Sequence, residues 1–301
     1  MNIYEIVDNL HQFGVNNIKL NEPLKNHTNI KIGGPAEIFV EVDSKKQLRS
    51  CINFFNSIKY KYFILGNGTN TLANDSGYKG AVICLKGLKK YKLSKDGIYA
   101  QAGVGLFQLN KLCRKFGLGG LEFSYGIPGS VGGAVCMNAG SYGYNLGDFI
   151  DYVCVLKNGR FKNISAKNMH FDYRTSIIQK SDLIVIGAKF KLAKSDGQQI
   201  EDLQNSYFQK RLQTQPYTEP SLGSVFKREE GQLPISKLID DLGLKGFKIG
   251  GACVSEKHAG FIVNKHLATC QDFVKLVNYV QNKVKSVYGF VPKLEIKILE
   301  N

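Results

Sequence analysis

The most informative part of the chain is GIPGSVGGAVCMNAGSYG, residues 126–143. Pro128 fixes the backbone of a turn. Gly132 and Gly133 carry no Cβ atom, so a flat ring or a pyrophosphate could approach their backbone closely. The segment from Ser130 onward can begin a helix, whose first N–H groups attract anions. These features predict a loop that binds a flat ring or a pyrophosphate.

The first glycine-rich loop in chain order, GNGTN at residues 66–70, directly follows the strand-like segment YFIL at residues 62–65. Its two glycines allow consecutive backbone N–H groups to converge on an anion. Thr69 and Asn70 add side-chain donors, so a diphosphate would fit this loop. The alternative is a tight turn without a ligand, because short glycine motifs also occur by chance.

Neither loop has the G-x-G-x-x-G spacing of a dinucleotide-binding Rossmann turn. One further segment, GVG at residues 103–105, lacks the third glycine. The sequence therefore disfavours a dehydrogenase built around a nicotinamide-binding Rossmann domain.

Helix and strand signals alternate along the whole chain and indicate an α+β fold. Ser44 is a favourable N-cap for the second helix, and Asn158-Gly159 is typical of a two-residue hairpin turn. A turn-rich segment, QPYTEPSLGS at residues 215–224, marks a boundary before a third unit. Helices are predicted over residues 3–13, 44–58, 106–116, 196–214, 233–242 and 269–288, and strands over 36–42, 62–65, 81–85, 98–102, 150–156, 183–192, 260–264 and 294–299.

The chain is strongly basic, with 40 Lys and Arg against 25 Asp and Glu and a formal charge of +15. Such a field attracts polyanions, which include nucleic acids and phosphorylated small molecules. The lysines are scattered, as on an ordinary solvated surface, and no helix-turn-helix, zinc-finger or aromatic RNA-binding signature is present. We therefore expect a phosphorylated small molecule and no nucleic-acid partner.

The seven cysteines form no C-x-x-C pair, and several lie in apolar stretches, which favours a reducing compartment and a cytoplasmic protein. No apolar run approaches the ~20 residues that span a bilayer, and no signal peptide is evident, so no membrane association is expected. His258 and His266 have no Cys or acidic neighbours at ligand spacing, and no metal site is predicted.

Five motifs occur in an order that resembles the UDP-N-acetylenolpyruvoylglucosamine reductases of bacterial peptidoglycan synthesis, in their shorter form. They are LGNGTNTLANDSGYKG (residues 65–80), GIPGSVGGAVCMNAGSYG (126–143), FDYRTS (171–176), PSLGSVFK (220–227) and KHAGFIVN (257–264). The resemblance runs from about His27 to the C-terminus.

The resemblance implies an α+β protein whose FAD-binding region has two parts, of the vanillyl-alcohol-oxidase (PCMH) type, followed by an α+β substrate-binding domain. We place the two FAD-binding parts at residues 1–88 and 89–198 and the substrate domain at 199–290. The terminal strand within 291–301 would return to the second part. The implied reaction uses NADPH to reduce FAD and then reduces the enolpyruvyl group of a UDP-sugar. The protein is expected to be a monomer.

The same resemblance implies the site residues. Arg174 matches the family's catalytic arginine, Ser224 its proton donor, and Glu295 a glutamate near the C-terminus. The implied substrate-binding residues are Arg174, Lys227, Tyr217, Arg211 and Asn138. The implied FAD-binding residues are Gly66, Asn67, Gly68, Thr69, Asn70, Gly126, Ile127, Pro128, Gly129, Ser130, Gly133 and Ala134.

Two positions depart from the family pattern. Lys293 stands where the first of two acids is usual, so the placement of Glu295 depends on the register of the segment. Arg228-Glu229 replaces the usual Asn-Pro or Arg-Pro after PSLGSVFK. Taken singly, each polar residue could also be an ordinary surface side chain. An FAD-dependent oxidase of the same fold, acting on another substrate, is the alternative function.

Overall fold

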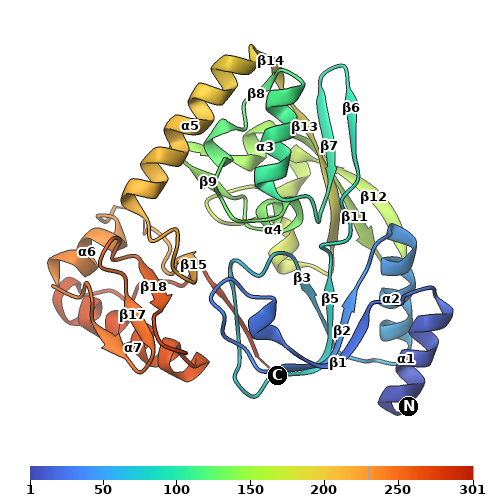
Figure 1. Cartoon of the computed structure of the whole chain (residues 1–301), viewed down its shortest axis with the longest axis horizontal. Coiled ribbons are helices and arrows are strands. Elements are labelled where there is room, and N and C mark those ends of the chain that lie inside the picture. The colour runs from blue at the N-terminus through green and yellow to red at the C-terminus, as the bar shows by residue number, and fades with distance from the viewer. Residues whose placement is uncertain (230, 301) are drawn as a thin grey trace. The chain divides into compact units, whose positions relative to one another are not determined.

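The structure, a computed structural model, describes residues 1–229 and 231–300. The chain forms two compact units, each assembled from separated stretches of sequence (Figure 1). The first unit comprises residues 1–20, 38–67 and 80–209, and the second comprises residues 21–37, 68–79 and those from 210 onward. Each unit is described separately below.

Every predicted helix is present. Capping boxes at Asn2, Ser44 and Thr269 define three of the helix starts, as their side chains accept backbone N–H groups of the first turn. The helix predicted from residue 233 starts later, because Leu233 precedes Pro234 and that position disfavours helical backbone. The helices are α1 Ile3–Gln12, α2 Lys45–Ser57, α3 Leu106–Lys115, α4 Val131–Cys136, α5 Gly197–Thr214, α6 Ile235–Asp241 and α7 Cys270–Tyr288.

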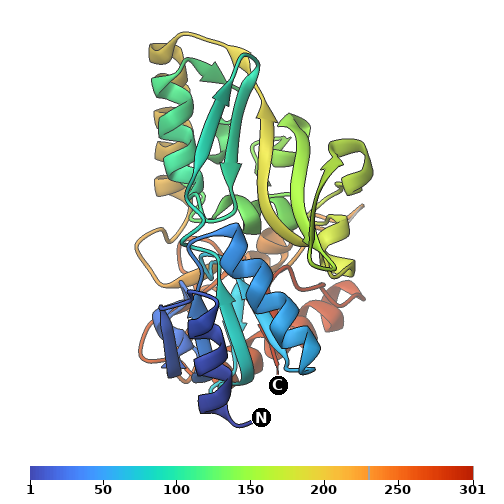
Figure 2. The same cartoon turned by 90° about the vertical axis from the view of Figure 1, so that its right-hand side faces the viewer.

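A five-stranded antiparallel sheet is the centre of the first unit, and its strands lie side by side in Figure 2. The predicted hairpin is confirmed, since Asn158 and Gly159 both have positive φ (48° and 70°) and Lys157 pairs with Arg160. The sheet order is β12 (Arg160–Ser165), β11 (Ile150–Lys157), β13 (Ile184–Lys191), β7 (Gly97–Gln101) and β6 (Tyr91–Ser94).

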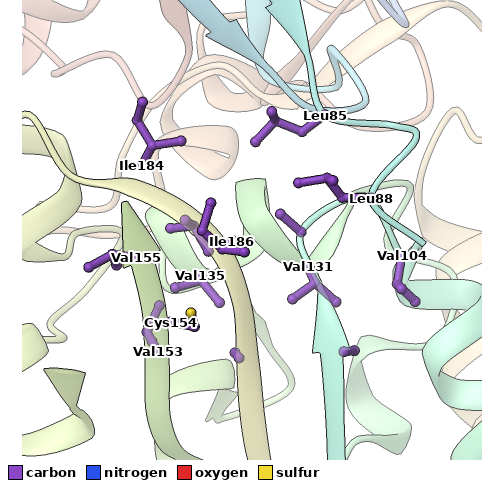
Figure 3. Close-up of a cluster of buried hydrophobic side chains, with 14 of the residues drawn as sticks. Leu85, Leu88, Val104, Val131, Val135, Val153, Cys154, Val155, Ile184 and Ile186 are labelled. Atoms are coloured by element: carbon purple, nitrogen blue, oxygen red, sulfur yellow. The ribbon is translucent and has the colours of Figure 1, made fainter. Parts of the chain in front are cut away.

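The short helix α4 packs its apolar side on this sheet. Val135 lies near Ile186 of β13 in Figure 3, and Val131, Val135, Ile186 and Val153 of β11 are all buried in one core. Ser130 caps α4, because its Oγ accepts the N–H of Gly133 at 3.5 Å. The predicted helix start at Ser130 is therefore correct, and the sheet holds the glycine-rich stretch in place.

A second sheet, most of whose residues belong to the first unit, has the order β1 (Ile18–Pro23), β2 (Pro35–Glu41), β5 (Tyr78–Cys84) and β3 (Tyr62–Leu65). The helices α1 and α2 lie side by side (Figure 2). The rings of Phe13 and Phe54 meet edge to face, with their centroids 5.6 Å apart. Two short pairs complete the unit: β8 (Leu118–Gly119) with β14 (Ala193–Lys194), and β9 (Gly140–Ser141) with β10 (Tyr144–Asn145).

The second unit is built around a four-stranded antiparallel sheet with α6 and α7. Its order is β15 (Ser221–Ser224), β18 (Phe261–Asn264), β17 (Ala252–Val254) and β16 (Lys248–Ile249). The same unit holds a parallel pair, β4 (Thr71–Ala73) with β19 (Lys297–Leu299). The short strands β1, β4, β6, β15, β16 and β17 were not predicted, because segments of two to six residues carry little periodic signal.

The C-terminal strand requires a correction. It was expected to return to residues 89–198, but β19 pairs with β4 instead, and the N–H of Lys297 donates to the carbonyl of Asn70 at 2.9 Å. Local alternation predicts that a segment is a strand but not which partner it finds. The boundaries at 88, 198 and 290 stay a prediction.

Candidate active site

The two predicted glycine-rich loops come into contact at Gly66 and Ser130, both in the first unit. A Cβ atom at position 66 would lie 2.7 Å from the Oγ of Ser130, closer than such atoms pack. Gly66 is therefore required for this approach. Because Ser130 caps α4, the end of the first loop's strand meets the start of that helix.

The glycines of the longer stretch serve different purposes. A Cβ at Gly132 would lie 2.9 Å from the Cβ of Ala102, so this glycine allows α4 to pack against the chain that follows β7. That corrects the expectation that Gly132 is kept free for a ligand. Gly133 is exposed. A Cβ atom at this position would lie 3.7 Å from its nearest neighbour, Ser130 Oγ, which is an ordinary van der Waals distance. Gly126 has a φ of 86°, which favours glycine.

The remaining residues of that stretch are Ile127, Pro128, Gly129 and Ala134. Pro128 is exposed, Ile127 and Gly129 are half-buried, and Ala134 is buried. The carbonyl of Gly129 accepts the N–H of Leu106 at 2.9 Å, which joins the turn to the start of α3. Backbone and small side chains dominate this surface, as a ligand that needs close approach requires.

In the second unit, Gly68 and Asn70 are held by contacts of their own. Gly68 has a φ of 65°, and its carbonyl accepts the N–H of Asn29 at 2.9 Å. The Nδ2 of Asn70 donates to the carbonyl of Glu295 at 3.1 Å. Asn67 and Thr69 are half-buried. The side chain of Asn70, expected to be a donor to a diphosphate, thus anchors the segment that carries Glu295.

Arg174 lies in a tight turn of the first unit, where Asp172 and Thr175 exchange backbone hydrogen bonds of 3.3 and 3.2 Å. It has a φ of 53°, a left-handed conformation that is uncommon for a residue other than Gly, Asn or Asp. Its Nη2 donates to the carbonyl of Gly140 at 2.8 Å, and its guanidinium lies over the ring of Tyr173. A strained backbone at a half-buried cation is a common feature of functional sites.

Asn138 has both ends of its amide in use. Its Nδ2 donates to the carbonyl of Asp172 at 3.0 Å, and its Oδ1 accepts the N–H of Gly147 at 2.8 Å. The residue is buried, with a φ of 43°. These contacts hold the Arg174 turn beside the glycine-rich stretch, and the expected contact of Asn138 with substrate stays a prediction.

Ser224 is the last residue of β15, and a β-bulge precedes it. Ser221 pairs with Val263 and Ser224 with Phe261, so Leu222 and Gly223 oppose a single residue of β18. Gly223 has a φ of 77° and no atom within 4 Å of where its Cβ would be. Its backbone conformation, rather than lack of space, requires glycine, and the bulge sets the direction of the strand at Ser224.

The segment after Ser224 pairs with the segment that carries Glu295. The N–H of Glu295 donates to the carbonyl of Val225 at 2.8 Å, and the N–H of Lys227 donates to the carbonyl of Lys293 at 2.8 Å. The second unit therefore brings Ser224, Lys227 and Glu295 together. Glu295 and Lys227 are both half-buried.

The two departures from the family pattern contact one another. The Nζ of Lys293 lies 3.2 Å from Oε2 of Glu229, and Oε1 of the same carboxylate accepts the N–H of Lys293 at 3.4 Å. The pair closes the ladder between residues 225–227 and 293–295. An exposed pair of this kind contributes at most about 1 kcal/mol.

Arg211 and Tyr217 also belong to the second unit. Arg211 lies at the end of α5, where it is buried and its Nη1 donates to Oε1 of Gln215 at 3.3 Å. Tyr217 is exposed. The expected contacts of Arg211 and Tyr217 with substrate remain predictions.

Three side chains make contacts that were not predicted from the sequence. Gln179 and Ser176 donate to the carbonyl of Cys136, at 3.0 and 2.7 Å. The Nδ1 of His258 accepts the N–H of Gly260 at 3.2 Å, and burial lowers the pKa of this histidine. Ser176 and His258 lie inside recognised motifs, but polar residues in such motifs do not reveal their partners.

Several expected properties concern the whole chain. Each of the seven cysteines is a free thiol. Within residues 1–229 and 231–300, His, Cys, Asp and Glu side chains form no group that could hold a metal ion. Over the same residues, none of the helices has the length and apolar character needed to cross a bilayer.

Residues 36–165 match the family described as FAD binding domain, and residues 215–299 match the UDP-N-acetylenolpyruvoylglucosamine reductase, C-terminal domain. The α+β fold with its two glycine-rich loops is thus that of a flavoprotein, in which an FAD binding domain is followed by the C-terminal domain of a reductase.

The comparison with individual proteins is more specific. A UDP-N-acetylenolpyruvoylglucosamine reductase of Clostridium tetani is 41% identical over 298 residues, covering 99% of this chain and 96% of the relative. One from Caldanaerobacter subterraneus is 42% identical over 281 residues, covering 93% of each chain. The crystal structure of the Thermus caldophilus enzyme (MurB) is 32% identical, with a TM-score of 0.81 over 94% of this chain and 98% of that one. This chain belongs to the UDP-N-acetylenolpyruvoylglucosamine reductase family.

Proposed function

We propose that this protein binds FAD and uses NADPH to reduce UDP-N-acetylenolpyruvoylglucosamine to UDP-N-acetylmuramate, a step in peptidoglycan precursor synthesis and cell wall biogenesis. It acts as a monomer in the cytoplasm, where the reducing conditions suit seven free thiols. Its partners are the nucleotide sugar and the nicotinamide cofactor, and neither nucleic acid nor a membrane is involved.

The contact between Gly66 and Ser130 is the observation that carries this proposal. The contact joins the end of β3, which leads into the loop at residues 66–70, to the start of α4. The residues that meet there have a small side chain or none. Gly133 is exposed and carries no Cβ atom, so a flat ring or a pyrophosphate could approach the backbone at the start of α4 closely. These residues fit a dinucleotide cofactor, which we assign to residues 66–70 and 126–130 with Gly133 and Ala134.

Bound FAD supplies a carrier that accepts hydride from one substrate and delivers it to the other. Delivery to the β-carbon of an unsaturated carboxylate places negative charge on that carboxylate. The guanidinium of Arg174 can grip a carboxylate through two hydrogen bonds and stabilise its developing charge. The stacking on Tyr173 and the bond to Gly140 hold that guanidinium in one orientation.

A proton must then reach the α-carbon. We assign this step to the hydroxyl of Ser224, a weak acid whose efficiency depends on placement more than on its pKa. Glu295, joined to the same segment by its backbone, would assist when protonated by donating to the charged intermediate. Lys227, Arg211 and Tyr217 are assigned to the diphosphate and sugar of the substrate.

The test is spectroscopic. Purified protein should be yellow, NADPH should bleach it under anaerobic conditions, and UDP-N-acetylenolpyruvoylglucosamine should restore the colour. A colourless protein that takes up no added FAD would exclude the proposal. Restoration of colour by oxygen alone, with no response to the nucleotide sugar, would favour the alternative function, an FAD-dependent oxidase that acts on another substrate.

A further inference from the structure

The turn that carries Arg174 is held by a single amide side chain on its C-terminal side. The Nε2 of Gln179 donates to the carbonyl of Arg174 at 3.0 Å and to the carbonyl of Cys136 at 3.0 Å. The Oγ of Ser176 donates to the same Cys136 carbonyl at 2.7 Å. One side chain thus joins the backbone of Arg174 directly to the end of α4.

This turn needs external support because its backbone is strained. A left-handed non-glycine residue costs about 1–3 kcal/mol and persists only where its surroundings hold it. Arg174 has a φ of 53°, and the bonds between Asp172 and Thr175 are long, at 3.3 and 3.2 Å. Gln179 supplies a donor to the carbonyl of the strained residue, so its loss would let the turn relax.

The contact also links the turn to the glycine-rich stretch. Cys136 is the last residue of α4, the helix that Ser130 begins. Asn138, two residues further on, holds Asp172 at the other side of the turn. The direction of the Arg174 side chain is therefore set from the helix that opens in the cofactor loop.

We infer that Gln179 is a positioning residue for Arg174, one that governs substrate reduction without touching the substrate. The inference rests on the function proposed above, in which Arg174 stabilises charge on the substrate carboxylate. It predicts a selective defect, because reduction by NADPH requires no contact with that carboxylate.

The experiment measures both half-reactions of the FAD-loaded protein by rapid mixing. In Gln179→Leu, FAD content and bleaching by NADPH should stay within about twofold of the parent. The limiting rate of reoxidation by the nucleotide sugar should fall by about tenfold or more, since small displacements of a catalytic group have effects of this size. Equal slowing of both half-reactions, or of neither, would overturn the inference.

Two further variants separate positioning from general damage. Gln204→Leu is a matched control, because the Nε2 of Gln204 also donates two hydrogen bonds. Both go to Asn110, at 3.1 Å to its backbone carbonyl and at 3.3 Å to its Oδ1. It should lower the melting temperature without a selective effect on reoxidation. In combination with Arg174→Lys, Gln179→Leu should add little further slowing. A double variant that multiplies the two effects would show that Gln179 acts elsewhere.

Gln179→Glu keeps the size of the side chain, so it tests the positioning role of Gln179 even if the leucine variant fails to fold. An ionised carboxylate has no donor for the Arg174 carbonyl, whereas the protonated acid has one. Relative to the parent at each pH, reoxidation should therefore recover as the pH falls through the ordinary glutamate pKa of about 4.3. A flat ratio would count against the inference. If the parent itself binds FAD but is not reoxidised by the nucleotide sugar, the proposed function has failed instead.

Discussion

The side chain of Asn70 donates a hydrogen bond of 3.1 Å to the backbone carbonyl of Glu295, across a separation of 225 residues. The carbonyl of Asn70 in turn accepts the N–H of Lys297 at 2.9 Å. A residue of the first glycine-rich loop therefore sets the position of the segment that carries the C-terminal acid.

Asn70→Ala should lower the free energy of unfolding by about 1 kcal/mol, the usual contribution of one hydrogen bond. Because Glu295 loses its anchor, reoxidation by the nucleotide sugar should slow more than reduction by NADPH. Asn29→Ala is the control, since it removes a similar bond, of 2.8 Å to the Ser221 carbonyl. An equal effect of both variants on reoxidation would mean that the Asn70 contact is purely structural.

Gly66→Ala should impair cofactor binding. The added methyl group would lie 2.7 Å from Ser130 Oγ and must displace the cap of α4. We expect FAD affinity, measured by fluorescence titration of the apoprotein, to fall by about tenfold or more, which corresponds to about 1.4 kcal/mol. Gly197→Ala, whose Cβ would meet nothing closer than 3.5 Å, should bind FAD normally.

Gly223→Ala tests the bulge before Ser224. A left-handed alanine costs roughly 1–2 kcal/mol, and relaxation of that strain would move Ser224. Gly289→Ala is a matched control, because Gly289 also has a positive φ (81° against 77°) and open space around its Cβ. Both variants should lose similar stability in chemical denaturation, while only Gly223→Ala slows reoxidation. Normal reoxidation in Gly223→Ala would show that the bulge does not place Ser224.

Ser224→Ala should leave bleaching by NADPH intact, because only the second half-reaction needs a proton on carbon. Removal of a positioned proton donor costs about 10²–10⁴-fold, so reoxidation by the nucleotide sugar should slow within that range. Rapid-mixing absorbance measures both steps. If both slow equally, Ser224 has a role in cofactor placement instead of proton transfer.

His258 should make stability depend on pH. Burial lowers its pKa in the folded protein, so the unfolded chain binds a proton more readily. Stability from this group is fully present above the unfolded value near 6.5 and is lost as the pH falls from there toward the lowered pKa. The melting temperature of His258→Asn should therefore fall less between pH 7 and pH 5 than that of the parent. Identical losses would exclude His258 as the source.

Patterns within the chain were sufficient to predict six of the helices and the longer strands, whereas the short strands were missed. Apolar spacing and caps such as Ser44 predict helices because helix formation depends on neighbours within one turn. The hairpin at Asn158-Gly159 depends on the backbone preferences of the same residues. The ordered motifs single out Arg174, Ser224 and Glu295 as candidate catalytic residues, and these roles stay predictions.

The partners of these residues depend on contacts between distant parts of the chain. Nothing local to Lys297 selects β4 over another strand edge, and nothing local to Gln179 reveals that its amide meets Arg174 and Cys136. Asn70 and Asn138 looked like ligand donors, but folding presented each with a backbone carbonyl. A buried hydrogen-bond donor pairs with whichever acceptor the folded chain brings within reach. The sequence alone does not show which acceptor that is, because the partners can be far apart along the chain.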